Sequence, residues 1–261
     1  MAGFRAYLEN LKDLRAGDSA FLSAAESRHL CGALRAQKGD MVDVFDLSKY
    51  YCRAEIICAS AKKTEIKILE KREVCDSRPP VILAQCLPKT GAFDSIISSA
   101  IQLGATAIFP LFSERCVVKF EGAAEAGRKL EKWRVHVIEA VKQSSNFFAL
   151  NIFPPQKFAD FLAGANSLLP EKCARIVASL EAENPKPLLS LLECQNAGGA
   201  CVLIGPEGDM SKSEYAAAHA AGFAPATLGE NVMKCEVAAG YAVSVCRAYF
   251  SKKAAGQGEQ K

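Results

Sequence analysis

Short segments in which apolar and polar residues alternate dominate the first part of the chain. Alternation with a period of two predicts strands with one buried face, and such runs occupy residues 41–45, 52–58 and 64–69. One helix interrupts them, because Ser23 and Glu26 have the spacing of a capping box, in which each side chain bonds the other residue's backbone amide. We expect that helix to end near Gly39. The pattern predicts a small β-rich module in residues 1–75.

The pattern changes near residues 74–80, where Pro79 and Pro80 forbid a helix and favour an extended connection. We place a domain boundary there, which divides the chain into residues 1–75 and 76–261. Beyond it, helical patterns separate apolar runs at residues 81–87, 106–110, 173–179, 200–205 and 226–228. Continuous apolar strands separated by helices predict an α/β domain, with a parallel sheet covered by helices on both faces.

Two helices of this second region have clear ends in the sequence. Apolar residues at helical spacing begin at Phe93 and stop at Gly104, and Ser211 and Glu214 form a second capping box. The tail from Ala254 contains few apolar residues, so we expect it to be frayed.

Composition is typical of a globular protein that folds in water. Apolar residues make up 50% of the chain and charged residues 23%. No apolar run approaches the roughly 20 residues that span a bilayer, and the N-terminal segment lacks the apolar stretch of a secretory signal. We therefore expect a cytoplasmic protein without a membrane partner. The net charge of +3 does not by itself indicate a polyanion as partner.

The 11 cysteines are scattered along the chain, contain no Cys-x-x-Cys pair and are accompanied by only three histidines. This spacing is typical of neither a disulfide scaffold nor a zinc site. We expect no metal, and we interpret most of the cysteines as small core residues.

Two glycine turns are the candidates for ligand chemistry. The phosphate-binding loop G-x-x-x-x-G-K-[ST] and the dinucleotide turn G-x-G-x-x-G are both missing, which argues against an ATPase and a dinucleotide-binding domain. Instead, Gly-Pro-Glu-Gly follows a predicted strand at residues 205–208, and a Leu-Gly turn opens residues 228–243. Such turns let the backbone approach a ligand at the carboxyl edge of a parallel sheet. Spacing alone leaves two interpretations open: a small-ligand pocket, or plain strand-to-helix connections.

Five motifs, in order along almost the whole chain, resemble those of one enzyme family. They are RHLCGALRAQKGD (28–40), LPKTGAFDSIISSAIQLGATAIFPLFSERCVVK (87–119), KWRVHVIEAVKQSS (132–145), IGPEGDMSKSE (204–214) and LGENVMKCEVA (228–238). The chain resembles the 16S ribosomal RNA uridine-N3 methyltransferases of the SPOUT superfamily, the RsmE type. The resemblance implies a PUA-like β-barrel that helps bind RNA, followed by a SPOUT domain with a deep trefoil knot that holds S-adenosylmethionine. It also implies a homodimer formed through the knot region, and 16S ribosomal RNA or the assembled 30S subunit as substrate.

The resemblance assigns a cofactor pocket in which the backbone makes most of the contacts with adenine. Its residues are Leu180, Ile204, Gly205, Pro206, Glu207, Gly208, Leu228, Gly229, Asn231, Val232 and Met233.

Several positions depart from the family's motifs. Asp209 stands where the family usually has glycine, Lys234 replaces an arginine and Val237 replaces a threonine. Asn146 replaces an arginine, and Gln102 replaces a glutamate. Lysine and arginine are not equivalent where a guanidinium makes two parallel bonds. These departures therefore bear on substrate geometry and turnover.

Methyl transfer to uridine N3 requires that the N3 proton leaves or that the resulting anion is stabilised. Our hypothesis is that Lys234 or Arg115 stabilises negative charge on the uracil oxygens. Glu236 or Glu207 then orients the loop or assists proton removal. The alternative for Glu236 is a purely structural role at the N-terminus of the last helix, where a carboxylate is favourable.

Phosphate contacts require exposed cations on one surface. The residues that we predict to contact RNA are Arg5, Arg28, His29, Arg35, Arg115, Lys119 and Arg134. We interpret Trp133 as a core or interface anchor, and we assign no role to His136 and His219. Two alternative functions remain: methylation of another RNA position, and RNA binding without methyl transfer.

Overall fold

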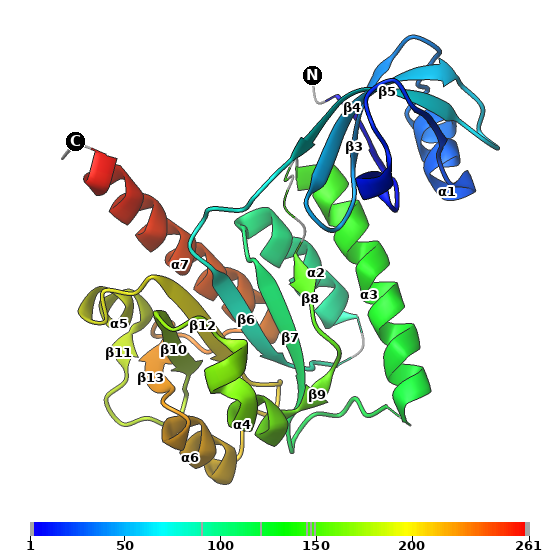
Figure 1. Cartoon of the computed structure of the whole chain (residues 1–261). Coiled ribbons are helices and arrows are strands. Elements are labelled where there is room, and N and C mark those ends of the chain that lie inside the picture. Colours follow the sequence, from blue (N-terminus) through cyan, green and yellow to red (C-terminus); the bar gives the residue numbers. More distant parts are fainter. Residues whose placement is uncertain are drawn as a thin grey trace. The chain divides into compact units, whose positions relative to one another are not determined.

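The computed structural model describes residues 3–89, 91–120, 122–144, 146, 148 and 150–258. The chain divides into two compact units (Figure 1). The first unit comprises Met1–Ser77 and Ile138–Ala149, and the second comprises Arg78–Val137 and Leu150–Lys261.

The first unit is built on a five-stranded sheet of order β1-β3-β4-β5-β2. Its strands are β1 (Phe4–Tyr7), β2 (Ser19–Phe21), β3 (Met41–Phe45), β4 (Tyr50–Cys58) and β5 (Glu65–Glu73). Strand β1 runs parallel to β3, and the other pairs are antiparallel. The three strands predicted from alternation are therefore confirmed, whereas β1 and β2 lie in segments for which the pattern predicted no strand.

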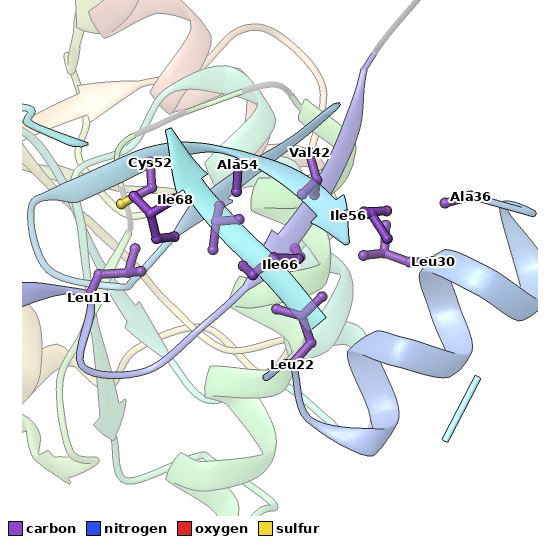
Figure 2. Close-up of a cluster of buried hydrophobic side chains, with 12 residues drawn as sticks. Leu11, Leu22, Leu30, Ala36, Val42, Cys52, Ala54, Ile56, Ile66 and Ile68 are labelled. Carbon is purple, nitrogen blue, oxygen red and sulfur yellow. The ribbon is translucent and has the colours of Figure 1, made fainter. Parts of the chain in front are cut away.

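Alternate residues of these strands form one hydrophobic core (Figure 2). Val42, Ile56 and Ile66 are fully buried in it, as are Leu11 and Leu30 from outside the sheet. Because successive side chains of a strand point to opposite faces, the long strands β4 and β5 bury one set and leave most of the other at least partly exposed.

The helix of the first unit is shorter than predicted. Helix α1 (Ala24–Ser27) continues as a π-helical segment (Arg28–Ala33), after which Arg35 adopts a left-handed backbone with φ of 57°. That conformation cannot continue a right-handed helix, so the predicted end near Gly39 is wrong. The 3-10 turn Leu11–Asp13 is the other short helical segment of this unit.

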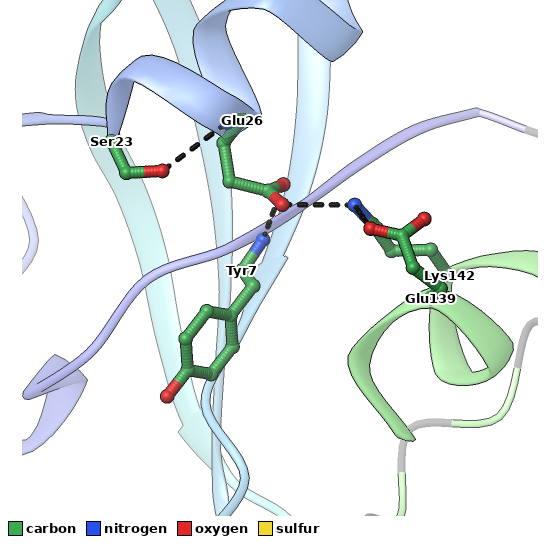
Figure 3. Close-up of polar contacts among 5 residues, drawn as sticks. All are labelled: Tyr7, Ser23, Glu26, Glu139 and Lys142. Carbon is green, nitrogen blue, oxygen red and sulfur yellow. Dashed lines mark hydrogen bonds and ion pairs between the residues drawn. The ribbon is translucent and has the colours of Figure 1, made fainter. Parts of the chain in front are cut away.

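Glu26 makes only half of the predicted capping box (Figure 3). Its backbone N–H donates to Ser23 Oγ at 3.2 Å. Its carboxylate instead accepts a hydrogen bond from Tyr7 N–H at 3.0 Å and one from Lys142 Nζ at 2.8 Å. The glutamate therefore joins the sheet to a segment 116 residues away in sequence.

That distant segment is the end of helix α3 (Ala123–Ser144), whose last residues belong to the first unit. The Lys142 side chain is only 5% exposed and lies between Glu26 and Glu139. Burial lowers the pKa of Lys142, but the hydrogen bonds to the two glutamates outweigh it, so the pKa is raised overall and the ammonium stays charged. Residues 138–149 thus complete a unit that the sequence pattern had predicted to end near residue 75.

The second unit contains a parallel sheet of order β11-β13-β10-β12-β6-β7-β8, with β9 paired to β7. Every pairing in it is parallel, as predicted. The strands are β6 (Val81–Cys86), β7 (Ala107–Phe112), β8 (Asn151–Ile152), β9 (Gln156–Lys157), β10 (Cys173–Ala178), β11 (Lys186–Pro187), β12 (Gly199–Ile204) and β13 (Ala224–Thr227).

Helices cover both faces of this sheet, as the apolar runs predicted. Helix α4 (Phe158–Leu168) packs with α6 (Lys212–Ala220), and α2 (Ala92–Leu103) packs with α7 (Cys235–Gly258), which also contacts α5 (Leu188–Cys194). In Figure 1, α4 and α6 lie in front of the sheet, and α2 and α7 lie behind it.

Three predictions about these helices are confirmed. Helix α2 ends at Gly104, and the Ser211–Glu214 capping box is fully formed. Trp133 is 4% exposed and packs edge-on against Phe93 with ring centroids 4.7 Å apart, so it is a core anchor. The tail from Ala254, for which we predicted fraying, is helical as far as Gly258, and its last three residues lie outside the described part of the chain. None of the described helices is long and apolar enough to span a membrane.

Candidate cofactor pocket

A cavity of about 480 Å³ lies where β10, β12 and β13 end. Its walls are residues 178–180, 204–207, 209, 226–229 and 231–236, together with Ala92 and Ala238. Both glycine turns singled out in the sequence therefore face one cavity. This is the carboxyl edge of the parallel sheet, where ligands of α/β proteins usually bind.

The first turn, residues 205–210, is held by groups from several other elements. Lys89 N–H donates to Glu207 Oε1 at 2.9 Å, and Arg115 Nη1 donates to the Gly208 carbonyl at 2.9 Å. The Gly205 carbonyl accepts from Gln85 Nε2 at 3.4 Å and from the Cys235 thiol at 3.5 Å. The position of this turn is thus determined by contacts with β6, with the segments that follow β6 and β7, and with the start of α7.

The end of this turn is fixed by helix α6. Asp209 has a left-handed backbone with φ of 58°, a conformation that aspartate tolerates better than most side chains. Tyr215 Oη donates to Asp209 Oδ1 at 2.7 Å. Glu214 closes the capping box on Ser211, and its other carboxylate oxygen accepts from Glu114 N–H at 2.7 Å. Helix α6 therefore holds the end of the turn through Tyr215, and is itself bonded to the segment that follows β7 through Glu214.

The second turn, residues 228–234, is more exposed. Gly229 has φ of 143°, and its N–H and carbonyl both bond Thr227 Oγ1, at 3.1 and 2.9 Å. Val232 is 77% exposed and Lys234 is exposed at the cavity wall. Helix α7 begins directly afterwards, where the amides of residues 237 and 238 donate to the Lys234 carbonyl.

Cys235 follows the second turn directly, lines the cavity and bonds the first turn through Gly205. Burial raises the pKa of its thiol to about 11, and the nearby carboxylates of Glu207 and Glu236 add to this effect. The thiol is therefore protonated at neutral pH and serves as a donor to Gly205 rather than as a nucleophile.

A family model described as "RNA methyltransferase domain" matches residues 76–247, which include the whole cavity wall. The chain belongs to this RNA methyltransferase family. Curated relatives carry the name ribosomal RNA small subunit methyltransferase E. The protein from Synechocystis sp. is 32% identical over 83% of this chain and 69% of its own length. The protein from Aquifex aeolicus is 29% identical over 88% of this chain and 95% of its own length.

Solved structures share the fold of this RNA methyltransferase. The ribosomal RNA small subunit methyltransferase E of Neisseria gonorrhoeae, in a crystal structure with S-adenosyl methionine bound, superposes with a TM-score of 0.81 at 24% identity. The match covers 94% of this chain and 97% of that chain. At this identity the likeness concerns the fold, including the first unit.

The cavity brings together most of the residues that the sequence assigned to cofactor binding. Ten of those eleven residues line it, and Gly208 is the exception. A Cβ at Gly208 would lie in ordinary van der Waals contact with Arg115, 3.4 Å from its Cβ, so Gly208 faces the arginine.

The three predicted catalytic residues have different positions. Lys234 and Glu236 line the cavity, whereas Arg115 lies outside its wall and bonds the Gly208 carbonyl. Glu236 lies in the first turn of α7, where a carboxylate is favourable, and it also lines the cavity.

The predicted RNA contacts are mostly exposed. Arg28, Arg35, Lys119 and Arg134 are exposed, His29 is half-buried, and Arg134 pairs with Glu131. Arg5 contradicts the premise of an exposed cation: it is 9% exposed, its guanidinium donates to the Val141 carbonyl at 3.1 Å, and burial lowers its pKa.

Sequence reasoning missed two residues that shape the cavity. Tyr215 gave no signal, because a tyrosine inside a helical pattern reads as core. Asp209 did give one, since it replaces the glycine of the family's motif, but its partner could not be inferred from spacing.

Proposed function

We propose that this chain transfers a methyl group from S-adenosylmethionine to N3 of a uridine in 16S ribosomal RNA. The observation that carries the proposal is the single cavity between the two glycine turns of an RNA methyltransferase family member. The ribosomal substrate is supported by the names of the curated relatives. The N3 position is supported by the motifs that the chain shares with the uridine-N3 enzymes.

The residues of the cavity fit S-adenosylmethionine. Its volume of about 480 Å³ suits a nucleoside-sized ligand. Leu228 and Met233 offer apolar contacts to a purine, and the backbone of both turns offers hydrogen bonds. Glu207 provides a carboxylate for a cationic ligand. When bound, this cofactor supplies a methyl group that is already activated, so the protein's task is alignment and exclusion of water.

The chain's own residues then serve the uridine. Lys234 stabilises negative charge on the uracil oxygens as the N3 proton leaves, because it is the exposed cation of the cavity wall. Glu236 lies two residues away on the same wall and orients Lys234 or accepts the proton. Arg115 contributes by holding the Gly208 carbonyl and with it the first turn.

The remaining expectations belong to the same proposal. The first unit acts as the PUA-like RNA-binding domain, with Arg28, His29 and Arg35 on its surface and Lys119 and Arg134 on the second unit. The second unit contains the trefoil knot and forms a homodimer. Large apolar side chains exposed around the cavity support the dimer: Leu180, Val232, Val237 and Tyr241 are between 42% and 77% exposed. A ribosomal substrate places the protein in the cytoplasm.

A transfer assay tests the proposal. Purified protein is incubated with methyl-labelled S-adenosylmethionine and 30S subunits from a strain that lacks its own N3-uridine methyltransferase, and the RNA is digested to nucleosides. We expect label in N3-methyluridine at one site. Label in another nucleoside would favour methylation of a different position. No label with protein that still binds RNA would favour the non-transferring alternative.

A further inference from the structure

The Tyr215 hydroxyl lies where two loops of the cavity wall meet. Tyr215 is 4% exposed and belongs to helix α6, which follows the first turn. Its hydroxyl donates to Asp209 Oδ1 at 2.7 Å and accepts from Leu180 N–H at 3.4 Å. One buried oxygen thus bonds the turn that follows β12 and the loop that follows β10.

The loop after β10 has its own internal bonds. Ser179 Oγ accepts from the amides of Glu181 and Ala182 at 3.3 and 3.1 Å. The Leu180 side chain is 63% exposed, so packing does not hold it. Two backbone groups of this segment contact helix α6 through Tyr215: Leu180 N–H donates to the hydroxyl at 3.4 Å, and the Ala178 carbonyl lies 3.5 Å from it.

Asp209 is an unusual residue for its backbone position. It has φ of 58° in a motif where the family usually has glycine, and most side chains disfavour this conformation. The hydrogen bond that Tyr215 Oη donates to the Asp209 carboxylate at 2.7 Å favours aspartate at this position. Burial and the adjacent carboxylate raise the pKa of Tyr215, so the hydroxyl keeps its proton and remains a donor at physiological pH.

We propose that Tyr215 and Asp209 form a positioning pair that fastens residues 178–180, at the end of β10 and the start of the loop after it, to the turn of residues 205–210, and thereby sets the affinity of the cavity for S-adenosylmethionine. The proposal rests on the proposed function for the identity of the ligand. Neither residue takes part in bond making. The pair reduces the number of arrangements that the two walls adopt before binding, and preorganisation of this kind strengthens binding.

Tyr215→Phe is the first test, because it removes one oxygen and keeps the ring in the core. We expect the Kd for S-adenosylmethionine, measured by calorimetry, to rise about tenfold, which is the effect of leaving buried hydrogen-bond partners unsatisfied. The KM for the cofactor should rise similarly, with kcat within about twofold of wild type, since the pair does not touch the reacting atoms. Tyr249→Phe is the matched control, because Tyr249 is also buried but lies on helix α7, outside the cavity wall. This variant should bind S-adenosylmethionine normally.

Variants at Asp209 separate the bond from general stability. Asp209→Asn keeps an acceptor oxygen and tolerates the left-handed backbone, so it should bind within about threefold of wild type. Asp209→Gly removes the acceptor without backbone strain and should weaken binding. Because both residues act through one bond, the double variant Tyr215→Phe/Asp209→Gly should bind no worse than Tyr215→Phe. Wild-type affinity in Tyr215→Phe, or fully multiplicative losses in the double variant, would overturn the proposal.

Hydrogen exchange of the free protein tests the pair without any ligand. In Tyr215→Phe the amides of residues 178–182 and 205–210 should exchange faster together, while amides of the first unit stay unchanged. Unchanged exchange in both segments would refute the pair even if S-adenosylmethionine binds. Failure of the wild-type protein to bind S-adenosylmethionine would instead refute the proposed function, and the exchange result would still decide whether the two loops are fastened.

Discussion

The two glycine turns that face the cavity are held in different ways. The turn of residues 205–210 receives hydrogen bonds from Gln85, Lys89, Arg115 and Tyr215, which come from four separate parts of the second unit. The turn of residues 228–234 is bonded mainly to its own neighbour, Thr227. One wall of the cavity is thus fixed before a ligand arrives, and the other is exposed.

This difference fits separate functions for the two turns, one in cofactor binding and one in substrate contact. A fixed wall suits a cofactor that has the same shape in every cycle, because preorganised contacts lose little entropy on binding. An exposed wall suits contact with a macromolecular substrate, and it is the wall that contains Lys234. We therefore expect changes in the first turn to affect cofactor affinity, and changes in the second turn to affect turnover.

Gly205→Val should have the largest effect. A Cβ at Gly205 would lie 3.3 Å from Asp209 Oδ1 and 3.4 Å from the Met210 amide nitrogen. Since the turn is held at several points, it cannot move away, and the new side chain also enters the cavity. Overpacking of this kind costs about 1–3 kcal/mol, and with the loss of cavity volume we expect cofactor affinity to fall about 100-fold. Calorimetry measures it, and Gly127→Ala, at an open position on α3, is the control.

Lys234→Ala should separate turnover from binding. Loss of a cation that stabilises developing charge typically lowers kcat about 100-fold, whereas the Kd for S-adenosylmethionine should stay within about threefold, because Lys234 belongs to the exposed wall. Single-turnover methylation and calorimetry measure the two quantities. A normal kcat would remove Lys234 from the mechanism, and Lys234→Arg, which restores the family's usual residue, should retain activity.

Arg115→Ala should show the opposite behaviour, with a smaller effect. The variant loses the bond from the guanidinium to the Gly208 carbonyl and loosens the fixed turn. A hydrogen bond from a charged group contributes about 1.5–3 kcal/mol. Because the Arg115 side chain is exposed, we expect the lower end of this range, which corresponds to roughly a tenfold rise in Kd. If kcat falls strongly and Kd is unchanged, Arg115 acts on the uridine rather than on the turn.

The reactivity of Cys235 gives the smallest expected effect. Its pKa of about 11 exceeds the ordinary value of 9.0, so at pH 8 the folded protein contains less of its thiolate than the unfolded chain does. Iodoacetamide at pH 8 should label Cys235 at least about tenfold more slowly than the exposed Cys58, Cys75 and Cys194. Mass spectrometry measures the rates, and equal rates would contradict a buried thiol that joins the two turns.

The same raised pKa predicts a direction for stability. The unfolded chain releases the Cys235 proton above about pH 9, whereas the folded protein releases it near pH 11, so the contribution of this group to the free energy of unfolding falls as pH rises above 9.

The local pattern predicted the strands around the site but not the bonds that fix it. Apolar runs located β6, β7, β10, β12 and β13, because buried strands need continuous apolar residues. The motifs then placed both glycine turns on one cavity. The partners of Asp209 and Glu26 are long-range, and the end of α3 joins a unit formed by residues far earlier in the chain. Spacing describes neighbours along an element, so such tertiary pairings leave no period in the sequence.

The short elements were missed for a related reason. Strands β8, β9 and β11 contain two residues each, too few for any alternation to appear. The helix of the first unit ends before Arg35, which has a left-handed backbone that arginine rarely adopts. Since the sequence has no glycine at this position, the end of the helix could not be predicted there.

A crystal structure of the protein with S-adenosylmethionine would show whether one wall of the cavity is fixed before binding. We expect electron density for the cofactor between residues 205–209 and 228–233, with the first turn unmoved and any displacement confined to the second. Cofactor bound elsewhere, or a first turn that rearranges to admit it, would refute a fixed wall.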